Sequence, residues 1–112
     1  MNPVQYRSVG SYVNAAAGDA DITGDSIDAA QFTKASMLVV NTGTNTPAGN
    51  IYIQASDDNS TFVNASTAIA VSGAENNIIT ISDLCSRYIR FFYDSASGGA
   101  SSTFTVHYTL KS

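Results

Sequence analysis

The run Phe104–Lys111 constrains the fold most, because apolar and polar side chains alternate strictly along it. Alternation of this kind is typical of a β-strand with one face in a core, since successive side chains point to opposite sides. The polar set, which includes His107, is expected to face outward. The side chains predicted to fill the core are Phe104, Val106, Tyr108 and Leu110.

A second run, Tyr88–Tyr93, is rich in aromatic and apolar residues on both of its alternating faces. Such a run is typical of a strand buried on both sides or at an oligomer contact. The segment 94–103 is rich in Ser and Gly and could reverse the chain. We therefore expect 88–93 and 104–111 to lie side by side as the closing hairpin. The surplus face of the first strand, Tyr88, Arg90 and Phe92 or their alternates, is expected to meet a neighbouring layer or subunit.

The composition favours β-structure in a single domain. The chain has 112 residues, of which 12% are charged, about half of the usual share. Ser, Thr, Asn and Gly take the place of charged residues, and β-branched and aromatic residues are plentiful. This composition predicts an all-β protein with a neutral polar surface, or one whose surface is covered by partners.

Short strand candidates separated by turn residues fill the rest of the chain. The run 34–41 is interpreted as a buried strand, and 50–64 as a hairpin that turns at 56–60, with Ile51, Ile53 and Ala55 on one face. Short helical pieces are possible at 14–17 and 28–32. We predict an all-β fold, an antiparallel and jelly-roll-like β-sandwich of about eight strands. The remaining strand candidates are 6–9, 21–28 with a turn or bulge at Gly24, 67–71 and 76–82.

Residues 1–20 are expected to form an N-terminal arm or an edge strand, and residues 21–112 the single β-sandwich domain. An arm could lie on a neighbouring subunit, whereas an edge strand would belong to the domain itself. The start of the chain lacks the basic and apolar regions of a signal peptide. We therefore expect synthesis in the cytoplasm, without export by the general secretory route.

Charge and cysteine content argue against several functions. The net charge is −4, and the five basic residues are scattered, so direct nucleic-acid binding is not expected. No apolar run approaches the about 20 residues of a membrane-spanning helix. The single cysteine, Cys85, cannot form a disulfide within the chain and is not by itself a metal site.

The sequence offers little that points to catalysis or to a cofactor. The densest acidic group resembles part of a calcium loop around Gly24, but Ile22 and Ala30 stand where ligands are required. No motif accompanies a Ser-His-Asp set. We expect no catalytic, cofactor-binding or metal-binding residues and no enzymatic activity. The acidic group, interpreted as solvated turn residues, is Asp19, Asp21, Asp25 and Asp28.

Exposed aromatic residues are the better functional candidates, because they suit both protein interfaces and sugar stacking. The two hypotheses remain open at this point. As a protein interface, the candidate residues are Tyr6, Tyr12, Tyr88, Arg90 and Phe92. As a sugar site, the candidates are Tyr52, Asp57, Asp58 and Asn59.

Three segments, 50–62, 87–93 and 101–111, share a recognisable order. A strand ending Gln54-Ala55-Ser56-Asp57-Asp58 precedes Ser60-Thr61-Phe62, then a Tyr88-Ile89-Arg90 strand, then a terminal strand that reaches Lys111. This order resembles small β-sandwich proteins encoded in bacteriophage structural-gene regions. Discoidin-like sugar-binding sandwiches share the hairpin and the Tyr-Ile-Arg strand, but they are longer and usually carry Trp where Phe62 stands.

The resemblance implies a virion protein: a capsid cement or decoration protein, or a small coat protein. It implies contacts with the major capsid protein and with other capsid subunits, made as a homo-oligomer such as a dimer or trimer. It brings no catalytic residues. The alternative function is a discoidin-like carbohydrate-binding module on a virion or cell surface.

Overall fold

The computed structural model describes residues 5–14, 21–42, 49–71, 75–84, 86–95 and 102–112. These residues form ten strands and no helix, so none of them belongs to a helix that could cross a membrane. The strands are β1 (Gln5–Asn14), β2 (Ile22–Thr23), β3 (Ile27–Asp28), β4 (Lys34–Asn41), β5 (Gly49–Ser56), β6 (Val63–Asn64), β7 (Ile69–Val71), β8 (Glu75–Ile81), β9 (Tyr88–Ser95) and β10 (Ser102–Lys111).

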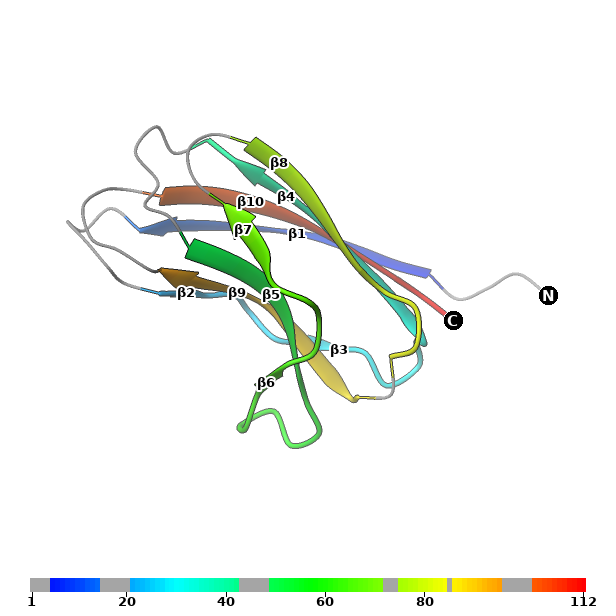
Figure 1. Cartoon of the computed structure of the whole chain (residues 1–112). Helices are drawn as coiled ribbons and strands as arrows, with labels where there is room; N and C mark the ends of the chain where they lie inside the picture. Colours follow the sequence, from blue (N-terminus) through cyan, green and yellow to red (C-terminus); the bar gives the residue numbers. More distant parts are fainter. Residues whose placement is uncertain (1–4, 15–20, 43–48, 72–74, 85, 96–101) are drawn as a thin grey trace.

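The strands form two antiparallel sheets that pack face to face (Figure 1). The four-stranded sheet has the order β1-β10-β4-β8, and the six-stranded sheet has the order β2-β9-β5-β6. Strand β3 also pairs with β9, and β7 also pairs with β5. Counting β2 with β3 and β6 with β7 as broken strands gives the eight strands of a jelly roll. The predicted jelly-roll-like β-sandwich is therefore confirmed.

The core lies between the two sheets. Strand β10 supplies Phe104, Val106, Tyr108 and Leu110, which are all buried as predicted. Strands β5 and β9 cover them from the opposite sheet with two further sets of buried side chains. These sets are Ile51, Ile53 and Ala55 from β5, and Ile89, Phe91 and Tyr93 from β9.

The predicted closing hairpin of 88–93 and 104–111 is wrong, because β9 and β10 belong to opposite sheets. Their aromatic side chains meet across the core instead. The ring of Phe104 lies 5.3 Å from that of Phe91 and 4.9 Å from that of Tyr93, centroid to centroid. Stacking the two apolar faces removes them from water together, which lateral pairing would not do. The prediction treated the linker as a hairpin turn, and residues 96–101 lie outside the described part of the chain.

Strand β4 was predicted to be buried, but only one of its faces is. Ala35, Met37 and Val39 point into the core, whereas Leu38 on the other face is 38% exposed. The continuous apolar run hid this alternation. The strand lies between β10 and β8, and none of the strands that the structure describes covers its outer side.

Strand β1 is longer than the predicted 6–9. It pairs with β10 along its full length, from Gln5 opposite Lys111 to Asn14 opposite Ser102, and forms one edge of the four-stranded sheet. The helix considered at 14–17 falls mostly on residues outside the described part, as do Asp19 and Cys85.

Two further local predictions can be compared with the structure. The hairpin at 50–64 is confirmed, with Gln54 opposite Asn64 in β5 and β6. Residues 28–32 form a turn rather than a helical piece, because the Asp28 carboxylate accepts a hydrogen bond from the Ala30 amide at 3.0 Å. This is the Asx turn that aspartate often makes.

Candidate interface on the outer face of the six-stranded sheet

The pairing of β5 with β9 brings several candidate residues onto one outward surface. Phe92 lies opposite Tyr52, and Arg90 lies opposite Gln54. Their neighbours Phe91 and Ile53 fill the core, so these side chains point away from it. We call this surface the outer aromatic face and define it as Tyr52, Phe62, Tyr88, Arg90 and Phe92, all of them half-buried.

Arg90 is at the centre of a fixed polar and aromatic cluster. Its Nε donates to Gln54 Oε1 at 2.8 Å, and Gln54 Nε2 donates to Asn64 Oδ1 at 3.0 Å. The guanidinium carbon lies 3.9 Å from the centroid of the Phe62 ring. Burial lowers the pKa of Arg90 by removing water from the charged form, although arginine remains protonated in proteins. The face therefore presents a cation whose position is set before any partner arrives.

Tyr88 continues this face toward one end of the sheet. It lies opposite Ser56 in β5, and the guanidinium of Arg87 lies 5.2 Å from the centroid of its ring. The alternate position in the same strand, Tyr93, is fully buried in the core. The outward-facing set of β9 is therefore Tyr88, Arg90 and Phe92.

The hairpin tip after β5 is organised by Asp58. Its Oδ1 accepts hydrogen bonds from the Thr61 amide at 2.8 Å, the Ser60 amide at 2.9 Å and the Ser56 hydroxyl at 2.8 Å. These donors, the Thr61 amide first, lower the pKa of Asp58 to about 2. Asn59 follows with φ of 60°, in the left-handed region that asparagine tolerates. The Asp58 carboxylate is thus used to hold the turn.

The sugar-site candidates do not come together as one site. Asp57 and Asp58 line a shallow hollow of about 310 Å³ with Ser56, Thr61 and neighbouring residues, and Tyr52 is not among its lining residues. Tyr52 lies in the middle of β5, and five residues of extended strand span about 16 Å. The tyrosine and the acidic tip are separate features of the same sheet.

Tyr6 and Tyr12, the other interface candidates, belong to β1 and lie apart from the outer aromatic face. The Tyr12 hydroxyl is 2.8 Å from that of Tyr108, and its ring stacks on Phe91 at 5.9 Å with 11° between the planes. Burial and the Tyr12 contact raise the pKa of Tyr108 well above its ordinary value. Tyr12 therefore packs against core residues of the opposite sheet and of its own sheet, whereas Tyr6 is 43% exposed beside Phe32.

Two of the acidic residues considered for calcium, Asp21 and Asp28, make local hydrogen bonds. The Asp21 Oδ1 accepts a hydrogen bond from the Ser95 amide at 2.9 Å, and Asp28 holds the turn that follows β3. Among the described residues, no three His, Cys, Asp or Glu side chains gather where they could hold a metal ion.

A second outward surface was missed by the sequence reasoning. Cross-strand pairing places Val9, His107, Leu38 and Ile78 in one line across the four-stranded sheet, and we call them the outer row. The exposed fractions are 61% for Val9, 38% for Leu38 and 61% for Ile78. The continuous apolar run from Met37 to Val40 gave no sequence signal that Leu38 faces outward.

These features define a jelly-roll β-sandwich with an ordered aromatic face on one sheet and an exposed apolar row on the other. The chain belongs to the family described as a domain of unknown function, DUF6385, whose profile matches residues 28–112. The matched region begins in β3 and leaves out β1 and β2. No curated protein matches the chain.

Two solved structures have a similar fold. The SPBc2 prophage-derived protein YomS is 14% identical, with 97% of this chain and 96% of that chain covered and a TM-score of 0.58. A protein of Bacillus endospore appendages, described as a novel family of disulfide-linked pili, is 13% identical, with 97% and 88% covered and a TM-score of 0.56. At these identities the likeness establishes the fold alone.

Proposed function

We propose that the protein is a non-enzymatic structural component that makes subunit contacts through its outer aromatic face. The observation that carries the proposal is the fixed cluster at Arg90, held by Gln54 and Phe62 on an open sheet surface. Tyrosine, phenylalanine and arginine are enriched in protein interfaces, and tyrosine and arginine are prominent among the residues that dominate binding free energy.

The order of this cluster favours binding. Fixing a flexible side chain on association costs roughly 0.5–1.5 kcal/mol. For Arg90 much of that cost is met in the free protein, because Nε already donates to Gln54 and the guanidinium rests on Phe62. The Nη groups of a guanidinium can then bond acceptors on a partner, with the flanking aromatic rings excluding water.

The finer proposal is a phage virion protein: a capsid cement or decoration protein, or a small coat protein, acting as a dimer or trimer on the major capsid protein. Support comes from the sequence resemblance and from the jelly-roll strand order. It is also compatible with the fold likeness to a protein described as prophage-derived. Contacts at several subunit joints at once would stabilise a shell by avidity.

The test begins with the gene neighbourhood, where a capsid or portal gene is expected. Shells assembled from the neighbouring major capsid protein should melt at a higher temperature with the wild-type protein than without it. The double variant Arg90→Glu/Phe92→Ser should lose this effect. Val63→Ser is the matched control, because Val63 is 63% exposed but lies outside the outer aromatic face.

Two results would count against the proposal. If Arg90→Glu/Phe92→Ser still raises the melting temperature of the shell, the outer aromatic face is not part of the contact. A monomer that leaves shells unchanged but binds a glycan array, and loses that binding on Tyr52→Ala, would favour the carbohydrate-binding alternative.

A further inference from the structure

We propose that the outer side of the four-stranded sheet is a docking surface for a second copy of this chain, which presents its outer aromatic face. Copies would then stack front to back, each using both broad sides of the sandwich. The inference rests on the proposed function, because it adds a second copy of the chain to the shell as a partner of the outer aromatic face; the face at the end of a stack stays free for the shell.

The apolar part of the docking surface is the outer row. Val9, Leu38 and Ile78 come from three different strands, yet pairing through β10 places them in one line with His107. Three of the five exposed large hydrophobic residues of the described chain thus lie on one surface. Contiguous exposed apolar side chains on a soluble domain mark interaction sites.

One end of this surface is basic. Lys34 and Lys111 are direct cross-strand partners on β4 and β10, and Arg7 is paired with Thr109 in the row beside them. Like charges directly opposite each other destabilise a sheet. A carboxylate from a partner would offset this repulsion, so the lysine pair favours an acidic occupant.

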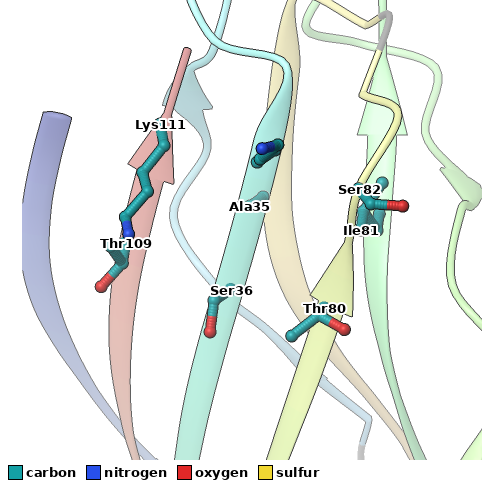
Figure 2. Close-up of a pocket in the computed structure, with 8 residues that line it drawn as sticks. Ala35, Ser36, Thr80, Ile81, Ser82, Thr109 and Lys111 are labelled. Carbon is teal, nitrogen blue, oxygen red and sulfur yellow. The ribbon is translucent and has the colours of Figure 1, made fainter. Parts of the chain in front are cut away.

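A shallow hollow lies at the same end of this surface. It has a volume of about 220 Å³, and Lys34 and Lys111 are among its lining residues. Figure 2 shows Thr109, Ser36 and Thr80 side by side on β10, β4 and β8, as their pairing requires. Their hydroxyl groups add hydrogen-bond donors to the same side of the sheet as the two lysines.

The outer side of the six-stranded sheet carries more acidic than basic groups, because four aspartates outnumber Arg87 and Arg90. Asp28 and Asp94 occupy outward positions on β3 and β9, and Asp57 and Asp58 follow β5 in the hairpin tip. By contrast, the outward positions of β1, β4, β8 and β10 that the structure describes include no Asp or Glu, and Asp83 follows β8 in the turn after Ser82. The two broad sides of one molecule are therefore complementary, and a second copy is an occupant with matching chemistry.

Asp28, Asp57 and Asp58 lie at the same end of the sandwich as Lys34 and Lys111, whereas Asp94 lies toward the other end of β9. The Thr33 amide donates to the Lys111 carbonyl at 2.9 Å, and the Leu84 amide donates to the Thr33 carbonyl at 2.7 Å. A hollow lined by Thr33, Leu84 and Asp57 joins this end to the hairpin tip. A copy displaced along the sheet normal would therefore bring its acidic tip toward Lys34 and Lys111.

The broad sides are large enough for a stable contact. The molecule measures 48 × 26 × 20 Å along its principal axes, so each broad side has a footprint on the order of 1,000 Å². A standard-size interface buries about 800 Å² per partner. Because the two contacting surfaces differ, the contact is heterologous and generates a ring or an open stack.

Sedimentation velocity of two variants and their mixture tests this arrangement. Ile78→Asp disables the docking surface, and Phe92→Asp disables the outer aromatic face. Each alone should weaken self-association by roughly tenfold or more, whereas a 1:1 mixture should form a dimer and nothing larger. Val63→Asp is the control for Ile78→Asp, because the two side chains are 63% and 61% exposed. Thermal melting confirms that each variant is folded.

The outcomes separate this inference from the proposed function. If the wild-type protein associates, and Phe92→Asp abolishes this association while Ile78→Asp leaves it unchanged, the stacking is wrong. The outer aromatic face would then still be an interface. A wild-type protein that stays monomeric at every concentration would also overturn the stacking, while the shell test still decides the proposed function. A charge swap gives a further check: Lys111→Glu should weaken association, and adding Asp57→Lys should restore it.

Discussion

The contact between Phe104 and Tyr93 gives the sharpest test of how the sheets pack. Both side chains are fully buried, and their rings lie 4.9 Å apart across the core. Phe104→Leu and Tyr93→Leu keep an apolar side chain, so each should cost about 1–2 kcal/mol of unfolding free energy. An aromatic pair contributes about 0.5–1.5 kcal/mol beyond its buried area. The double variant should therefore be less destabilised than the sum of the singles by that amount.

Urea denaturation of the four proteins of this cycle measures the coupling free energy. With a urea m-value of about 1–3 kcal/mol/M, each single substitution should lower the midpoint by roughly 0.3–2 M. The control cycle pairs Phe104→Leu with Phe92→Leu, because Phe92 is in the same strand as Tyr93 but faces outward. If the coupling free energy between Phe104 and Tyr93 is no larger than that between Phe104 and Phe92, the face-to-face packing of β9 and β10 is refuted.

Three further predictions concern pH and close packing. The pKa of Asp58 is lowered from 3.8 to about 2 in the fold, so its stabilisation is present above pH about 4 and is lost as the pH falls toward 2. Melting curves of wild type and Asp58→Asn should therefore converge over that range, while Asp57→Asn should follow wild type throughout. The pKa of Tyr108 is raised above 10.0, so wild-type stability should fall above pH 10 by up to about 1.4 kcal/mol per pH unit more than that of Tyr108→Phe, as measured by urea denaturation. Gly49→Ala would push a methyl group against the Asp94 carbonyl oxygen, and thermal melting should report a loss of about 1–3 kcal/mol.

Local patterns were enough to predict the strands of this fold. The alternation in 104–111 placed its four core residues correctly, because period-two patterning reports directly which side of a strand is buried. The hairpin at 50–64 was found from its turn residues. Neither prediction required knowledge of which strands become neighbours.

The placement of β9 and β10 in opposite sheets could not be predicted in the same way. Closeness in sequence favoured a hairpin, whereas the jelly roll sends these strands to opposite sheets. The sandwich buries the aromatic faces of both strands against each other, a gain that depends on the whole topology. Leu38 was misassigned for a related reason, since a continuous apolar run does not reveal which of its faces lacks a cover.

The candidate interface was predictable only in part. Tyr88, Arg90 and Phe92 follow from the alternation of a single strand. Their meeting with Tyr52 and Gln54 depends on the register between β5 and β9, and the contact of Arg90 with Phe62 depends on the hairpin next to them. The outer row could be predicted only from the pairing of four strands, two of which lie at the ends of the described chain. Such long-range registers are not encoded in any local pattern.

The central claim is that the outer aromatic face is a protein contact surface. Hydroxyl-radical footprinting read by mass spectrometry tests it without any substitution, because Tyr52, Phe92 and Tyr88 react in proportion to their exposure. We predict that all three become protected as dilute protein is concentrated or added to its shell, while exposed Val63 in β6 keeps its reactivity. Equal modification of the three aromatic residues in the dilute and the assembled protein would contradict the account.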